Sequence, residues 1–423
     1  MKITIHRGTQ EIGGTCIQVT SGGRSILLDA GLPLRESKSL VDLSRIDFDA
    51  VIISHSHQDH YGLIESLDDS VPVYIGEIGA KMIAAARTFT RQAPLQNNFR
   101  HFKSWEWFEF APFRIKPYLM DHSSVDAFGF LIEANGKRLF YSGDFRSHGS
   151  KEAVFERFVS SPPKGIDLLL MEGTMMGREG DVFKRESDLE HEMYDVLKGE
   201  TGPAFLICSG QHVDRLCTAY RACKRAGRIF VVDIYTAWIM QELKFHFDST
   251  PHFGWDDIRV LAHGGTASGH YRAIAGRPEF MAFLRSIYLS GNVIDADAIA
   301  RNPQQYFIKS SRVDLLLRSL KPSRCSLIYS QWQGYLEEEF NDDAWKLTQL
   351  RDHPSVDFHI IHTSGHAFKH DLKRYAEAIG AKMLVPVHTE RGDQFCEFTN
   401  VSIKQDGESF ELGEYYESMA EVC

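Results

Sequence analysis

The most constraining feature of this chain is a cluster of histidines and one aspartate directly after an apolar run. The run is Ala50-Val51-Ile52-Ile53, and the cluster that follows it is Ser54-His55-Ser56-His57-Gln58-Asp59-His60. A buried strand that ends in such a cluster delivers imidazole nitrogens and a carboxylate to its carboxyl end, where they can converge on a divalent metal ion. A polar loop with incidental histidines is a poor explanation for this spacing. The sequence therefore predicts a metal site at this strand end.

The same event, an apolar strand followed by a side chain that can bind metal, recurs along the chain. Apolar runs also end just before Asp29, His122, Asp144 and Glu172, and near the end of the chain before His362, His366 and His388. Open α/β sheets bind their ligands along the edge formed by the carboxyl ends of the strands. We therefore expect these side chains to gather along one sheet edge.

A change of pattern near residue 181 predicts an inserted domain. A strand at 204–208, a helix at 213–225 and a strand at 228–233 form a βαβ unit, which implies parallel strands with a covering helix. At 423 residues the chain exceeds the size at which one core usually keeps growing. We expect residues 1–180 to form the first part of the metal-binding domain, 181–350 an inserted domain, and 351–423 the return segment of the first domain.

Composition indicates an ordinary globular protein that does not enter a membrane. Hydrophobic residues make up 43% and charged residues 25% of the chain, and no apolar stretch approaches the ~20 residues of a membrane span. The seven cysteines are dispersed without a C-x-x-C pair, and the alternating start Met1–His6 resembles a strand rather than a signal peptide. We therefore expect a cytoplasmic protein. The net charge of −10 disfavours a surface that grips nucleic acid everywhere but permits a local basic groove.

Taken in order, these residues resemble the motifs of the metallo-β-lactamase fold, in the branch that carries an inserted β-CASP domain. His55 to His60 match the H-x-H-x-D-H motif. The motifs before and after it are matched by Asp29, His122 and Asp144, and the β-CASP motifs are resembled by Glu172, by Ser364-Gly365-His366 and by His388. The resemblance covers essentially the whole chain. It implies an α/β fold, an αββα metallo-β-lactamase sandwich with an inserted parallel α/β β-CASP domain.

The same resemblance indicates RNA as the substrate. Within the branch, a histidine at the third β-CASP motif, here His388, is associated with RNA, and a valine there with DNA. The segment His362-Thr363-Ser364-Gly365-His366-Ala367 is most similar to bacterial and archaeal ribonuclease J. The chain departs from ribonuclease J in two respects. Thr389-Glu390 follows His388, where ribonuclease J usually has glycine and then an acidic residue. We also expect this chain to lack the extra C-terminal domain that ribonuclease J usually has.

The resemblance also implies two divalent metal ions, with zinc expected and manganese as the alternative. One ion would be bound by His55, His57 and His122 and the other by Asp59, His60 and His388, with Asp144 as the bridge. Asp29 would orient a histidine by hydrogen bonding. The ions would lower the pKa of bound water toward about 7 and so make a hydroxide ready to attack a phosphodiester.

Further residues are expected to act on the proton and on the phosphate. Asp59 or Glu172 would hold or accept the proton of the attacking water. His366 would contact the scissile phosphate and protonate the leaving oxygen, a role suited to a near-neutral pKa. Ser364-Gly365 could offer a hydroxyl and a backbone N–H to a phosphate, with help from His362, although a tight turn needs the same residues.

These residues predict a metal-dependent phosphodiesterase that hydrolyses RNA, as an exo- or endoribonuclease, in a cleft between the two domains. One alternative is a small-molecule ester or lactone hydrolase on the same metal site, and another is a non-catalytic RNA-binding β-CASP pseudo-enzyme. The inserted domain disfavours the first, because a small substrate needs no domain-sized wall. The complete ligand set disfavours the second. The sequence is compatible with a homo-oligomer as well as a monomer.

Overall fold

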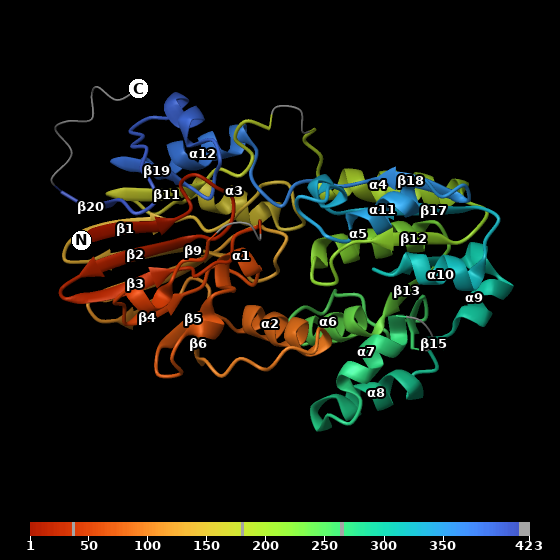
Figure 1. The fold of residues 1–423 in the computed structure, drawn as a ribbon. Coiled ribbons are helices and arrows are strands. Elements are labelled where there is room, and N and C mark those ends of the chain that lie inside the picture. The colour runs from red at the N-terminus through yellow and green to blue at the C-terminus, as the bar shows by residue number, and fades with distance from the viewer. Residues whose placement is uncertain (36–38, 179–181, 263–265, 414–423) are drawn as a thin grey trace. The chain divides into compact units, whose positions relative to one another are not determined.

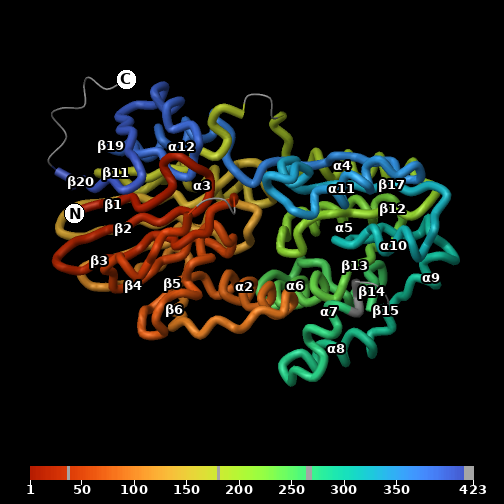
Figure 2. The backbone as a smooth tube through the Cα atoms, in the orientation of Figure 1, coloured from red at the N-terminus to blue at the C-terminus, as the bar shows by residue number. Residues whose placement is uncertain are grey.

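The computed structural model describes residues 1–35, 39–178, 182–262 and 266–413, and the chain divides into two compact units. The first unit consists of residues 1–81, 95–183 and 364–423, and the second consists of residues 82–94 and 184–363. The chain thus enters the second unit twice, as the tube in Figure 2 allows the reader to follow.

The first unit is built on two β-sheets (Figure 1). The first sheet has the order β20-β1-β2-β3-β4-β5-β6, with bounds Ser409–Glu411, Lys2–Arg7, Cys16–Ser21, Arg24–Leu28, Ala50–Ile52, Pro72–Gly76 and Asn98–Phe102. The second sheet has the order β19-β11-β10-β9-β8-β7, with bounds Met383–Val387, Leu168–Glu172, Lys137–Tyr141, Phe128–Ala134, Phe113–Leu119 and Phe108–Phe110. The helices that begin in this unit are α1 (Gln58–Tyr61), α2 (Glu77–Phe89), α3 (Glu152–Ser160) and α12 (Lys369–Ile379), with short 3-10 turns at Leu43–Arg45, Ile64–Ser66 and Gly392–Glu397.

The two sheets pack face to face through alternate apolar side chains. Ile3, Ile17 and Ile26 of the first sheet share one buried cluster with Phe130 and Leu139 of the second. All five side chains are fully buried. Because successive side chains of a strand point to opposite faces, each sheet also has an outer face that must be covered.

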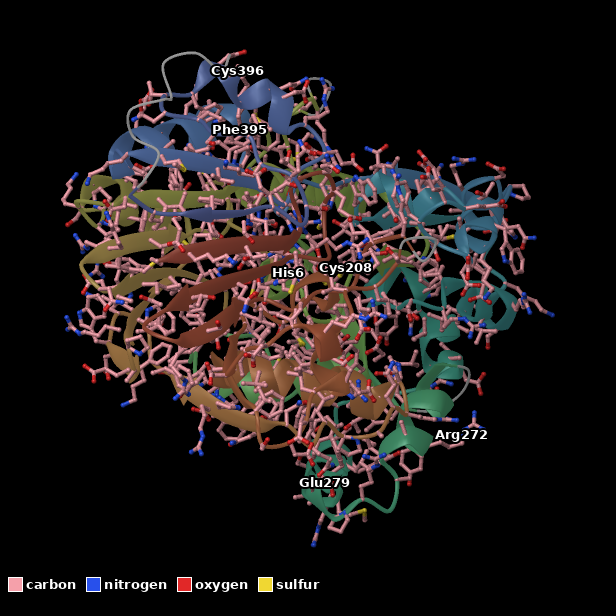
Figure 3. All side chains as sticks on the ribbon, turned by 60° about the vertical axis from the view of Figure 1, so that its left-hand side comes forward. His6, Cys208, Arg272, Glu279, Phe395 and Cys396 are labelled. Carbon is pink, nitrogen blue, oxygen red and sulfur yellow. The ribbon has the colours of Figure 1, made fainter. Side chains whose placement is uncertain are left out.

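Helices α3 and α12 cover the outer face of the second sheet (Figure 1). The rings of Phe158 on α3 and Tyr375 on α12 stack 4.6 Å apart and join Phe140 of β10 in a second buried cluster. Phe395 belongs to the same cluster, whereas its neighbour Cys396 is exposed (Figure 3). The prediction of an α/β fold is confirmed, and in this unit the layers form a sandwich.

The strand directions explain why the predicted residues converge. Strands β3, β4 and β5 are parallel, and so are β10, β11 and β19. Strand β8 runs in the direction of β10 because both are antiparallel to β9. The side chains at or just beyond the carboxyl ends of these strands are Asp29, His55, His122, Asp144, Glu172 and His388. In each sheet these ends lie at one edge.

The second unit is a seven-stranded, wholly parallel sheet with helices. Its order is β15-β14-β13-β16-β12-β17-β18, with bounds Val293–Ile294, Ile258–Leu261, Ile229–Asp233, Tyr306–Lys309, Ala204–Ile207, Cys325–Tyr329 and Val356–Ile360. Its α-helices are α4 (Glu186–Gly199), α5 (Val213–Arg225), α6 (Ile234–Lys244), α7 (Thr266–Ile274), α8 (Pro278–Leu289), α9 (Ala296–Arg301), α10 (Val313–Leu320) and α11 (Ala344–Arg351), and its 3-10 turns are Pro303–Gln305 and Gln333–Leu336.

The second unit extends further along the chain than the sequence pattern suggests. Strand β18 pairs in parallel with β17, from Cys325 opposite Val356 to Tyr329 opposite Ile360, and therefore belongs to this sheet. The chain returns to the first unit after Thr363 rather than at residue 350. The reason is that an apolar run followed by a histidine is compatible with the edge of either sheet, and pairing alone decides between them.

The six described cysteines form no disulfide bond, and four of them are buried: Cys16, Cys208 (Figure 3), Cys223 and Cys325. Burial raises the pKa of the Cys16 thiol to about 12 and that of Cys208 to about 11, so both stay protonated at neutral pH. They are core thiols rather than metal ligands. Among the helices of the described residues, none is both long and apolar enough to cross a membrane.

Candidate metal centre

The centre begins where β4 ends and α1 starts. His57 precedes the first residue of α1, so Asp59 and His60 lie in its single turn. The loop after β3 packs tightly on this turn, because a Cβ atom at Gly31 would collide with the backbone carbonyl of Asp59. The Ala30 N–H also donates to the His60 carbonyl at 2.8 Å. Two strand ends of the first sheet are thereby fixed to each other.

Three imidazoles form the first group of side chains that could hold a metal ion. The ligand atoms of His55, His57 and His122 all lie within 4.8 Å of one another. His57 Nδ1 is 3.0 Å from His55 Nε2 and 3.3 Å from His122 Nε2. Burial holds the pKa of His55 and His122 well below 6.5 and lowers that of His57. All three are therefore neutral at pH 7, which is the form that binds metals.

A second group consists of Asp59, His60 and His388, whose ligand atoms also lie within 4.8 Å of one another. Asp59 Oδ2 is 3.7 Å from Nε2 of each histidine. Asp144 lies between the two groups, since its Oδ2 is 3.1 Å from His60 Nε2 and 3.7 Å from His55 Nε2. The structure thus brings together all seven side chains that the sequence singled out as ligands.

Buried atoms without hydrogen-bond partners show that these residues fit a metal ion. His60 Nε2, His388 Nε2 and Asp144 Oδ1 are buried and have no such partner. Leaving a buried polar atom unsatisfied costs about 1–3 kcal/mol, so three in one place need an explanation. Imidazole nitrogens and carboxylate oxygens are the ligands that zinc and similar divalent ions take from proteins. A bound cation would satisfy all three atoms, and the cluster is a metal-binding site.

Charge within the cluster opposes the effect of burial at His60 and Asp144. Burial disfavours a protonated His60, but Asp144, Asp59 and Asp29 outweigh it and raise its pKa well above 6.5. Burial likewise disfavours the carboxylate of Asp144, but His388, His60 and His366 outweigh it and hold its pKa well below 3.8. Asp144 therefore stays ionised in the middle of the cluster, where its negative charge favours a bound cation.

Hydrogen bonds behind the cluster orient its histidines. Asp29 Oδ2 accepts from His60 Nδ1 at 2.7 Å and from the Tyr141 hydroxyl at 2.6 Å, which leaves His60 Nε2 to face the centre. Thr15 Oγ1 lies 2.9 Å from His388 Nδ1 and fixes that ring in the same way. Asp29 and His388 both have positive φ, 60° and 51°. The sequence pointed to Asp29 but gave no signal for Thr15 or Tyr141, which are single hydroxyls on or near strands.

Glu172 and His366 form a pair beside the ligand groups. Glu172, the last residue of β11, accepts from the Phe145 N–H at 2.9 Å. His366 Nδ1 lies 3.1 Å from Glu172 Oε2 and 3.7 Å from Asp144 Oδ2. Burial lowers the pKa of His366, but the charges of Glu172 and Asp144 outweigh it and raise the pKa above 6.5. His366 is 21% exposed, so its ring is accessible from outside the cluster.

Of the other candidate phosphate-binding residues, Ser364 and Gly365 lie in the first unit and His362 lies in the second. The Ser364 hydroxyl accepts from the His366 N–H at 3.0 Å, a bond within a tight turn. The Gly365 carbonyl accepts from His122 Nδ1 at 2.6 Å. His362 lies in the second unit, where its Nδ1 is 3.3 Å from Nη1 of the buried Arg215. The turn interpretation therefore accounts for the contacts of Ser364 without a phosphate.

Two segments match known protein families. Residues 24–194 match the β-lactamase superfamily domain, and residues 357–395 match a Zn-dependent metallo-hydrolase RNA specificity domain. A crystal structure of a protein of unknown function from Enterococcus faecalis V583 has the same fold, with a TM-score of 0.76 at 20% identity over 97% of this chain and 99% of that chain. Fold, site and family matches together make this chain similar to metallo-hydrolases with a β-lactamase superfamily domain.

The curated relatives show a narrower similarity than the two family models do. Ribonuclease J of Sinorhizobium meliloti is 23% identical over 82% of this chain and 58% of its own length, and Ribonuclease J of Mycoplasma pneumoniae is 24% identical over 92% and 68%. An RNase J-like protein of Methanocaldococcus jannaschii is 25% identical over 55% and 58%. The chain thus spans little more than half the length of the first of these relatives. The resemblance to ribonuclease J-like proteins of the β-CASP branch is confirmed.

Proposed function

We propose that this chain is a metal-dependent phosphodiesterase that hydrolyses RNA. The carrying observation is that His366 and His388, which complete the buried cluster, both lie in the segment that matches an RNA specificity domain. The names of the curated relatives support the same activity. The second unit, a parallel α/β domain inserted between Phe183 and Ser364, is in this proposal the β-CASP domain.

The chain's own residues would divide the work of hydrolysis. His55, His57 and His122 would hold one divalent ion and Asp59, His60 and His388 another, with Asp144 between them and zinc as the expected metal. Such ions supply a water of lowered pKa and neutralise charge on the phosphate. Asp59 or Glu172 would accept the proton of the attacking water. With Nδ1 held by Glu172, His366 would donate the proton on Nε2 to the leaving oxygen.

A digestion series tests the proposal. Metal-loaded protein is incubated with end-labelled RNAs that carry a 5′-hydroxyl, monophosphate or triphosphate, and the products are resolved by length. Mononucleotides released stepwise indicate an exonuclease, and defined fragments indicate an endonuclease. Hydrolysis of esters or lactones with intact RNA would overturn the proposal. So would intact RNA with added zinc or manganese together with well under one metal per chain, which would favour a non-catalytic RNA-binding protein.

The proposal predicts a specific change in pH dependence when Glu172 is replaced. An acid acts only while protonated, so its contribution is present below its pKa and is lost as the pH rises through it. Glu172 raises the pKa of His366. The Glu172→Gln variant should therefore have a lower His366 pKa, and the alkaline limb of its kcat–pH profile should move to lower pH. The exposed Glu156, replaced by glutamine, removes the same charge far from the pair and should leave the limb in place. A limb that stays in place or moves to higher pH in Glu172→Gln would contradict the assigned acid.

The described cysteines support a cytoplasmic location, because six reduced thiols without a disulfide are typical of a reducing compartment.

A further inference from the structure

We infer that Arg146 and His148 are positioning residues, which hold the loop Ser364–His366 so that the His366 ring stays on Glu172 and Asp144. The inference rests on the proposed function of His366 as the acid, and it adds a cause for the placement of that ring. Both residues follow Asp144, at two and four positions further along the chain. Arg146 is fully buried and His148 is 1% exposed.

Arg146 is anchored by an ion pair beneath the cluster. Its Nε lies 3.4 Å from Asp121 Oδ1, and its backbone N–H donates to the Asp121 carbonyl at 2.7 Å. The second carboxylate oxygen accepts from the Gly149 N–H at 2.9 Å. A Cβ at position 149 would collide with both the carboxylate and the guanidinium, so glycine is required there. Asp121 precedes the ligand His122, and the pair therefore links the segment after β8 to the segment after β10.

The same two side chains reach the loop that carries His366. The Ser364 carbonyl accepts from His148 Nε2 at 2.9 Å and from Arg146 Nη1 at 3.4 Å. The next carbonyl, that of Gly365, accepts from His122. Two consecutive carbonyl groups just before His366 are thus held by three side chains of the first unit. The direction in which the backbone leaves residue 365 is fixed by these bonds, and the position of the His366 ring follows from it.

The loop Ser364–His366 and the His148 ring both pack closely against their neighbours. A Cβ at Gly365 would lie 3.1 Å from Ser123 Oγ and 3.5 Å from His122 Cε1, so the loop lies directly against the segment after β8. The His148 ring itself is held by aromatic neighbours, with ring centroids 5.3 Å from both Phe183 and Phe368. A buried ion pair adds little net stability in general. Here the ion pair between Arg146 and Asp121 fixes geometry. The single segment Asp144–Gly149 thereby positions both the carboxylate of Asp144 and the loop that carries His366.

The choice of substrate separates this role from a structural one. RNA has a poor leaving group that needs a proton, whereas bis(p-nitrophenyl) phosphate releases its leaving group without one. His148→Leu should lower kcat on RNA by ~10²-fold, the lower end of what a positioned acid contributes to the rate. Its metal content and KM should be unchanged. Its rate on bis(p-nitrophenyl) phosphate should equal that of the unaltered protein. His148→Gln keeps an N–H donor and should restore most of the RNA rate. The exposed His191, replaced by leucine, serves as the matched control.

Hydrogen exchange provides a readout that does not depend on activity. In the metal-loaded protein, the backbone amides of residues 364–366 should exchange faster in His148→Leu than in the unaltered protein, and at the normal rate in His148→Gln and His191→Leu. Equal losses on both substrates, or unchanged exchange in His148→Leu, would overturn the inference. If the unaltered protein cleaves only the synthetic diester, the proposed RNA substrate fails, and the exchange rates alone decide whether the loop is held as inferred.

Discussion

Replacement of His57 by alanine is expected to abolish turnover through loss of bound metal. His57 Nδ1 is the common neighbour of His55 Nε2 and His122 Nε2, at 3.0 and 3.3 Å. Without it, the first group keeps two imidazoles and the carboxylate of Asp144, which the second ion would share, so the first ion loses one of its three imidazole ligands and is held more weakly. Metal content after dialysis, measured by elemental analysis, should fall in parallel with the rate on RNA.

The matched control for this prediction is His191→Ala, which removes an exposed histidine from the second unit and should change neither quantity. A thermal unfolding scan distinguishes metal loss from misfolding. The His57 variant should unfold cooperatively, at a temperature that added zinc raises less than in the unaltered protein, because a ligand stabilises only the form that binds it. Full metal content with a lost rate would mean that His57 acts on the substrate instead.

Replacement of His366 by alanine should leave the metals in place and lower kcat by about 10²–10⁴-fold, the usual contribution of a positioned acid or base. The reason is that His366 Nδ1 is held by Glu172 rather than by a ligand group. The comparison with bis(p-nitrophenyl) phosphate applies here too, since a substrate that needs no proton should be cleaved at nearly the unaltered rate.

The metal content of the His366→Ala variant is informative because His366 lies close to the candidate metal ligands. Together with His122 and Asp144 it forms a group of ligand atoms within 4.8 Å of one another. Loss of metal from His366→Ala would therefore make it a ligand and would leave the acid unassigned. His370, an exposed histidine four positions further on, provides the control, because its replacement removes an imidazole from the same chain segment without touching the cluster.

Much of the centre could be predicted from sequence because its residues follow a rule of sheet geometry. Parallel strands of one sheet end at the same edge, so Asp29 and His55 come together in the first sheet and Asp144 and Glu172 in the second. The sequence predicted a single sheet edge, whereas the centre draws on the edges of two packed sheets. The spacing His55-x-His57-x-Asp59-His60 adds chemistry to that placement. The α/β class followed from the same alternation of apolar runs and helices.

The supporting residues could not be predicted, because their roles depend on contacts across the sequence. Thr15 and Tyr141 contribute one hydroxyl each, at positions that a strand would occupy with any residue of similar shape. Arg146 and His148 follow Asp144 in what the sequence alone presents as an ordinary polar loop. Strand β18 shows the same limit for the fold, since its place beside β17 depends on pairing and not on its own periodicity.

The left-handed backbone at Asp29 and His388 limits how this chain can be made more durable. A non-glycine residue in this conformation costs of order 1–3 kcal/mol, and glycine would remove that cost at either position. Glycine would also remove the acceptor that His60 and Tyr141 share at Asp29, or the ring that Thr15 contacts at His388, and each loss offsets the gain. Such variants would hold metal worse without a net gain in stability. Engineering of this chain for durability should keep both positions fixed and seek its gains elsewhere.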